Sequence, residues 1–220
     1  AFARNGANFH TLAATSGLAP VHRGRKFGFF NASTDVSAML SDSSCNTVVI
    51  ATRHNTHSSL VKQALQAGKH VFVEKPLCLN LDQLSDIESV YTGETLLMVG
   101  FNRRFAPLTL LLKQQINKLS GPKAFIYTCN VGAIPAEHWT QDPGIGGGRL
   151  LGEACHFVDL LRFLVDSPID DLKIYNVADK KPCPDTFSLQ LKFKEGSIAT
   201  VHYFANGSKG FPKERLEVFC

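Results

Sequence analysis

The stretch TVVIATRHNTHSSLVKQALQAGKHVFVEK, residues 47–75, decides the fold class. It holds two short apolar runs, 47–52 and 70–75, and the first is nearly continuous, which is typical of a strand buried on both faces. Between the runs, apolar residues recur at helical spacing until Gly68 ends the segment: Leu60, Val61, Ala64 and Leu65. This order predicts two parallel strands joined by a helix.

The same alternation extends to both sides of this stretch. Residues 9–15 are predicted to form an earlier strand, and residues 33–40 a short helix with a Ser/Thr cap and Asp35 in its first turn. Residues 80–93 predict a further helix and residues 95–101 a further strand. A sheet of parallel strands with helices between them is typical of nucleotide-binding domains.

The pattern changes at about residue 102. Helices are predicted at 106–119 and 150–165, and the later runs alternate apolar with polar residues around a hairpin turn at 194–197. We therefore predict an α/β fold with two domains. Residues 1–101 form a first domain with an incomplete, Rossmann-type parallel sheet, and residues 102–220 form an α+β domain with an open, mainly antiparallel sheet. An uncovered sheet face often packs against another subunit, so we expect a homo-oligomer.

The composition is that of a globular protein, since 44% of the 220 residues are hydrophobic. The net charge of +4 is not gathered into a tract, so neither nucleic acid nor a membrane is expected as a partner. Six widely spaced cysteines without a CxxC pair argue against a zinc site and against disulfides. His54 and His57 have no adjacent carboxylate or cysteine, so no metal is expected. No signal-peptide pattern opens the chain, and we expect a cytoplasmic protein.

Polar residues follow three of the predicted strands, at 53–57, 74–76 and 102–104. In an open parallel sheet, ligands bind beyond the carboxyl ends of the strands, so these residues are candidates for a site. Lys75 is the most informative of them. A lysine at the end of a buried strand is partly desolvated, which favours its neutral form and lets it exchange a proton with a substrate hydroxyl. The alternative is a solvated surface lysine.

A glycine-rich run, GGGRLLGEACHFVD at 146–159, precedes and enters the second predicted helix. The glycines permit a close approach of the backbone, and the helix presents Glu153, His156 and Asp159 at i, i+3 spacing. Such a stripe suits proton transfer, with Glu153 or Asp159 orienting His156. The alternatives are a polar helix face on which His156 packs, and a surface pair between Glu153 and Arg149.

Three motifs in order, EKP at 74–76, GFNRRF at 100–105 and GGGxLLxxxxHxxD at 146–159, resemble the Gfo/Idh/MocA (glucose-fructose oxidoreductase / inositol dehydrogenase) family. The resemblance implies an NAD(P)-binding Rossmann domain joined to an α/β domain whose open sheet serves oligomerisation. It also implies a reaction at a secondary alcohol or carbonyl of a sugar, sugar nucleotide or cyclitol. By the same resemblance, Lys75 is the catalytic lysine, His156 is the substrate-side proton carrier, and Thr52 and Glu74 lie along the cofactor.

The other residues expected to bind the cofactor also lie at or near strand ends: Thr15, Ser16, Arg53, His57, Lys75 and Arg103. Thr15-Ser16 lacks the acidic residue that usually binds the ribose of NAD, whereas Arg23 and Arg25 are near in sequence, so NAD and NADP remain alternatives.

Two positions depart from the family pattern. The family usually has an aspartate four residues before the histidine, where this sequence has Gly152, and it commonly has Pro-Asn where this sequence has Arg53-His54. The run at 146–164, with the ending KERLEVF, resembles a subgroup in which this module follows an alcohol-dehydrogenase-like domain in a longer protein.

A GxGxxG motif, which would bind the cofactor pyrophosphate, is not found near the start of the sequence, and both ends look cut. We therefore expect a truncated, inactive piece of an oxidoreductase that by itself binds NAD(P) weakly or not at all. In the whole enzyme, Lys75 and His156 are expected to converge on one cleft between the two domains. The alternative function is a non-catalytic module of the same ancestry that binds a sugar nucleotide or a partner.

Overall fold

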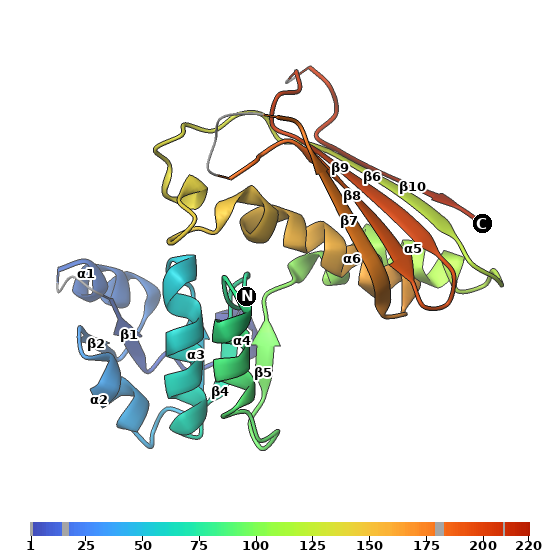
Figure 1. Cartoon of the computed structure of the whole chain (residues 1–220). Helices are drawn as coiled ribbons and strands as arrows, with labels where there is room; N and C mark the ends of the chain where they lie inside the picture. Colours follow the sequence, from blue (N-terminus) through green and yellow to red (C-terminus); the bar gives the residue numbers. More distant parts are fainter. Residues whose placement is uncertain (1, 15–17, 179–182, 209) are drawn as a thin grey trace. The chain divides into compact units, whose positions relative to one another are not determined.

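The computed structural model describes residues 2–14, 18–178, 183–208 and 210–220 (Figure 1). The chain divides into two compact units. Unit 1 comprises Ala1–Ala51, Ser58–Val73 and Asp82–Met98, and unit 2 comprises Thr52–His57, Glu74–Leu81 and Val99–Cys220. The two short segments at 52–57 and 74–81 follow strands of unit 1 but belong to unit 2.

Unit 1 is built on short parallel strands. β1 (Thr11–Ala13) pairs in parallel with β2 (Asn31–Ser33), and β3 (Thr47–Ile50) pairs in parallel with β4 (His70–Val73), beside which lies β5 (Leu97–Val99). The helix η1 (Phe2–Asn5) precedes the first strand, and the helices between the strands are α1 (Leu18–Phe27), α2 (Val36–Ser41), α3 (His57–Gln66) and α4 (Leu81–Glu88). The short helix η2 (His54–Thr56), which precedes α3, belongs to unit 2. The predicted Rossmann-type α/β class is confirmed by this parallel pairing.

The predicted helix at 33–40 begins later than its sequence suggested. Asp35 is itself the N-cap of α2, and its side chain accepts a hydrogen bond of 2.9 Å from the backbone N–H of Ala38. Ser33 belongs to β2 instead. The sequence analysis missed both β2 and α1, since α1 contains Pro20 and Gly24, which are poor helix formers and give no helical signal.

The prediction that the strand at 47–52 is buried on both faces is wrong. Successive side chains of a strand point to opposite faces, and in β3 the Ile50 side chain is buried whereas Val49 is 49% exposed. A continuous apolar run therefore does not by itself show that a strand is covered on both sides.

Unit 2 contains a five-stranded sheet in the order β10-β6-β9-β8-β7. Only β6 and β9 pair in parallel, so the predicted mainly antiparallel sheet is confirmed. The strands are β6 (Ala124–Asn130), β7 (Ile169–Asn176), β8 (Phe187–Phe193), β9 (Ile198–Phe204) and β10 (Glu214–Phe219). The predicted hairpin joins β8 to β9, and its turn needs Gly196 because the residue there has a φ of 104°.

Two helices, α5 (Pro107–Ile116) and α6 (Cys155–Val165), contribute to the core against one face of this sheet (Figure 1). Alternate residues of the strands point into that core, among them Phe125, Phe193, Val201 and Tyr203. Their neighbours in the strands, such as Ile126 and Ile198, are exposed on the opposite face. No helix in the described part of the chain is long and apolar enough to cross a membrane.

Candidate functional site

Lys75 lies in the segment that follows β4 and binds the backbone at the start of the α6 region. Its half-buried ammonium group donates a hydrogen bond to the carbonyl oxygen of Gly152. Gly152 is part of η5 (Leu150–Ala154), a π-helical turn that leads directly into α6. The predicted helix at 150–165 is therefore present, but its first five residues are π-helical. Turns of this kind occur frequently at functional sites.

His156 lies one helical turn after Gly152, and the positive charge of Lys75 acts on its ring. Its Nδ1 atom is buried and has no hydrogen-bond partner among the described residues. Burial, followed by the positive charges of Lys75 and Arg103, lowers the pKa of His156 to about 4. The ring is therefore neutral near pH 7. Phe101 presents its edge or face to this ring with a centroid separation of 6.1 Å.

Glu153 does not orient His156 as the sequence predicted. Its carboxylate accepts hydrogen bonds from Nε of Arg149 at 3.0 Å and from the hydroxyl of Tyr203 at 2.6 Å. Burial acts to raise the pKa of Glu153, but these hydrogen bonds and the charge of Arg149 lower it overall. Since Arg149 is only 3% exposed, its charge needs a close partner, and Glu153 supplies it. The pair that the sequence allowed at the surface thus joins a buried Arg149 to a partly exposed Glu153.

Asp159 is likewise bound to an arginine. Arg104 donates two hydrogen bonds to its carboxylate, and the bond from Nε is 2.7 Å long. A guanidinium that binds both oxygens is a stronger partner for a carboxylate than a neutral imidazole is. The two carboxylates that were predicted to orient His156 therefore bind arginine side chains in this structure.

His54, one of the candidate residues that follow β3, is a buried part of the same region. Its Nδ1 donates a hydrogen bond of 2.8 Å to the carbonyl oxygen of Gly146. The backbone N–H of Asn55 also donates to the carbonyl of Ile145, at 3.0 Å, so the glycine-rich loop is held by the segment after β3. Burial lowers the pKa of His54, and the nearby charge of Lys75 lowers it further. Two signals in the sequence pointed to it: its place after a predicted strand and the departure from the family pattern at 53–54.

Three of the predicted cofactor-binding residues have exposed side chains. The hydroxyl of Thr52 is 2.6 Å from that of Thr56, Arg53 packs over Trp139 with its guanidinium carbon 5.9 Å from the ring centroid, and Glu74 is exposed. These groups are accessible to a ligand. Thr15 and Ser16, which were also predicted to bind the cofactor, lie outside the described residues.

His57 and Arg103, which were also predicted to bind the cofactor, have partners within the protein. His57 is 0% exposed, and its ring nitrogens lie 2.7 Å from the carbonyl oxygen of Pro76 and 3.2 Å from that of Thr52. Arg103 binds both carboxylate oxygens of Glu214, one of them at 2.9 Å. It also packs on Phe157. His57 thus links two backbone segments, and Arg103 anchors strand β10.

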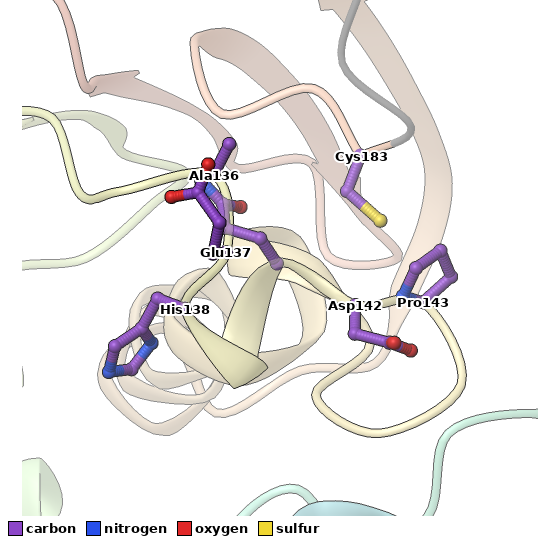
Figure 2. A pocket seen from close by; sticks show the side chains of 7 residues that line it. Ala136, Glu137, His138, Asp142, Pro143 and Cys183 are labelled. Carbon is purple, nitrogen blue, oxygen red and sulfur yellow. The ribbon is translucent and has the colours of Figure 1, made fainter.

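Two further groupings are visible only in three dimensions. A cavity of about 280 Å³ lies beside η4 (Trp139–Gln141), and Figure 2 shows its lining, which contains neither Lys75 nor His156: Ala136, Glu137, His138, Gln141, Asp142, Pro143 and Cys183. In unit 1, donor atoms of His10, Asp42 and Cys45 lie within 4.8 Å of one another. The sequence analysis did not identify this cluster, because it considered only residues close in sequence.

The parallel strands of unit 1 and the mixed sheet of unit 2 define an α/β protein with a Rossmann-type parallel sheet. Residues 5–101 match the model of an oxidoreductase family with an NAD-binding Rossmann fold, and residues 123–220 match the Gfo/Idh/MocA C-terminal domain. The chain belongs to the Gfo/Idh/MocA family.

Its relatives include dehydrogenases of cyclitols and sugars. The chain is 28% identical over 203 residues to myo-inositol 2-dehydrogenase of Thermotoga maritima, which covers 88% of the chain and 60% of the relative. It is 32% identical over 149 residues to scyllo-inositol 2-dehydrogenase (NAD(+)) of Bacillus subtilis, covering 66% of the chain and 42% of the relative. The chain thus spans about 60% or less of the length of these relatives.

Solved structures show the same fold. A probable dehydrogenase from Thermotoga maritima superimposes with a TM-score of 0.86 at 26% identity, covering 99% of this chain and 67% of the other. Levoglucosan dehydrogenase in complex with NADH gives a TM-score of 0.84 at 22% identity, covering 96% and 61%, and supports the fold.

Proposed function

We propose that the protein carrying this chain is an NAD(P)-dependent oxidoreductase that acts on a secondary alcohol or carbonyl of a sugar or cyclitol. One observation carries the proposal: a neutral histidine, His156, has a buried Nδ1 without a hydrogen-bond partner among the described residues, and the positive charge of Lys75 acts on its ring. A buried polar atom without a partner costs free energy, and a substrate hydroxyl would satisfy it. Family membership and the dehydrogenase relatives support the same reading.

Lys75 and His156 have different roles at the substrate oxygen. The Lys75 ammonium donates a hydrogen bond to that oxygen and stabilises the negative charge that develops as the hydroxyl loses its proton. His156 enters the reaction unprotonated and accepts the proton. In the direction of reduction, the same proton returns from His156 to the oxygen.

The residues after β3 and β4 fit a dinucleotide cofactor. The side chains of Thr52, Arg53 and Glu74 are exposed just beyond the carboxyl ends of parallel strands, where such cofactors bind. They offer hydroxyl, guanidinium and carboxylate groups that suit ribose and phosphate. When bound, the nicotinamide supplies the hydride acceptor or donor. The proposal does not rest on four other predicted cofactor-binding residues: Thr15, Ser16, His57 and Arg103.

The test is an assay of the purified full-length protein with NAD and NADP and a panel of polyols, including inositols, levoglucosan and sugar nucleotides. The absorbance of the reduced cofactor reports hydride transfer. Turnover that depends on Lys75 supports the proposal. Binding of a polyol or sugar nucleotide without turnover, with a correctly folded protein, would favour the non-catalytic module instead.

We also propose the finer organisation of the protein. Residues 1–101 and 102–220 are its cofactor and substrate domains, and limited proteolysis tests this division. The uncovered face of the unit 2 sheet carries exposed apolar side chains and is the surface for a homo-oligomer: Ile126, Tyr175, Ile198 and Phe219. The cysteines in the described residues are free, which is in keeping with a cytoplasmic protein.

A further inference from the structure

The imidazole of His54 occupies the space beside Gly152 that a larger residue would need. A Cβ atom built on Gly152 would lie 3.2 Å from Cε1 of His54 and 3.7 Å from its Nδ1. The first distance is tighter than an ordinary van der Waals contact, so even alanine at position 152 would push on the ring. The two positions that depart from the family pattern are therefore in contact with each other.

The tautomer of His54 follows from its hydrogen bond. The carbonyl oxygen of Gly146, 2.8 Å from Nδ1, can only accept, so Nδ1 carries the hydrogen. In the neutral ring, Nε2 is then a hydrogen-bond acceptor. Burial of the ring favours the neutral form, as does the charge of Lys75. Trp139 holds the ring from the side, with the centroids 4.8 Å apart and the planes at 74°.

Gly152 connects this imidazole to Lys75. Its carbonyl oxygen accepts the hydrogen bond from the Lys75 ammonium group, while its Cα faces His54. The charged and titratable groups that act on His54 are Lys75 and His57, and no carboxylate is among them. An acceptor in this position adds no negative charge beside Lys75, so the ammonium group stays available for the substrate oxygen.

We propose that His54 is a substrate-binding residue whose Nε2 accepts a hydrogen bond from a hydroxyl of the polyol, and that Gly152 is the residue that leaves room for it. The inference rests on the proposed function for the identity of the ligand. It assigns a specificity-determining role to a pair of residues: an imidazole acceptor at position 54 requires glycine at position 152.

A double-mutant cycle tests the coupling. In the full-length protein, we expect His54→Ala and Gly152→Ala each to lower kcat/KM by about tenfold to a hundredfold, mainly by raising KM, because each removes or displaces one hydrogen-bond acceptor. The double variant should be no worse than His54→Ala alone, since the methyl group then meets no ring. An equal cost of Gly152→Ala in both backgrounds overturns the coupling. His22→Ala, at an exposed histidine of α1, is the matched control and should leave both constants unchanged.

A second measurement does not depend on turnover. Nitrogen NMR of protein labelled at histidine, with the His54 signals assigned from His54→Ala, should show a neutral ring protonated at Nδ1, and inositol should shift its Nε2 signal. A ring protonated at Nε2, or an Nε2 signal that responds to none of the polyols, overturns the proposal. A polyol-dependent shift in a protein that transfers no hydride supports the role of His54 and instead contradicts the proposed function.

Discussion

Lys75 joins the segment after β4 to the π-turn before α6 through its hydrogen bond to Gly152. An ammonium group held by one carbonyl keeps two further N–H donors for other partners. A substrate oxygen can therefore bind without breaking the existing contact. Lys75 is the residue on which the proposed chemistry depends most directly.

Replacement of Lys75 by methionine keeps the length of the side chain and removes its charge. We expect kcat/KM to fall by about a hundredfold to ten-thousandfold, the size of an acid-base contribution. Steady-state kinetics measure this. Lys62→Met is the control, because Lys62 pairs with the exposed Asp86 on the surface and should leave activity unchanged. Full activity of Lys75→Met would contradict the assigned role.

The low pKa of His156 predicts a dependence of stability on pH. In the unfolded chain a histidine binds a proton below about pH 6.5, whereas the folded ring does so only near pH 4. Acid therefore favours the unfolded state between these values, and the free energy of unfolding should decrease as the pH falls from about 6.5 to 4. Urea unfolding of wild type and of His156→Gln measures this contribution. The variant should lose less stability across the window, and identical slopes would show that the ring is not buried in its neutral form.

At the level of elements, the π-turn η5 and helix α6 fix the positions of the proposed site. The turn is held from outside by Lys75, which binds the carbonyl of Gly152, and by Tyr203 of β9, which binds Glu153. Arg149, at the start of the turn, also donates a hydrogen bond of 2.7 Å to the carbonyl of Gly132. Glu153 is thus a positioning residue that anchors the turn to the sheet.

Glu153→Gln should therefore destabilise the protein more than it changes the chemistry. The buried guanidinium of Arg149 would lose its counter-charge, and we expect a loss of about 1–3 kcal/mol in the free energy of unfolding. Chemical denaturation measures it. Asp86→Asn removes the partner of a surface pair and should cost less than about 1 kcal/mol. Equal effects of the two substitutions would show that the Arg149 pair is no more than a surface contact.

For the whole molecule, the unit 2 sheet presents one face to the core and leaves the other open. Rows of paired residues cross the open face, for example Gln190, Thr200 and Ile126, which neighbour one another on β8, β9 and β6. Exposed apolar residues mixed with polar ones are typical of subunit interfaces.

We expect Ile126→Lys combined with Ile198→Lys to weaken self-association, because charged groups on the open face would have to be buried in the interface. Sedimentation equilibrium over a range of protein concentrations measures the association constant. Leu108→Lys, at an 80% exposed position of α5, is the control and should leave it unchanged. A wild-type protein that remains monomeric at all concentrations would contradict the proposed interface.

The sequence by itself determined most of the strands and helices, although not β2 or α1, the change of architecture near residue 102, and the position of Lys75 just after β4. These features depend on local patterns, namely the spacing of apolar residues and the turns that end each element. The motifs also identified the family. The matches of residues 5–101 and 123–220 to its two domains confirm this identification.

Only the tertiary structure decided which partners the polar side chains take. Asp159 binds Arg104 across 55 positions, Glu153 binds Tyr203 across 50, and Arg103 binds Glu214 across 111. Each carboxylate had several donors that were compatible with the sequence, and the packing of distant segments brought one of them within hydrogen-bonding distance. The contact between His54 and Gly152 is of the same kind. Periodicity along the chain places a residue on a face, but the competition among distant partners is settled only when the segments pack together.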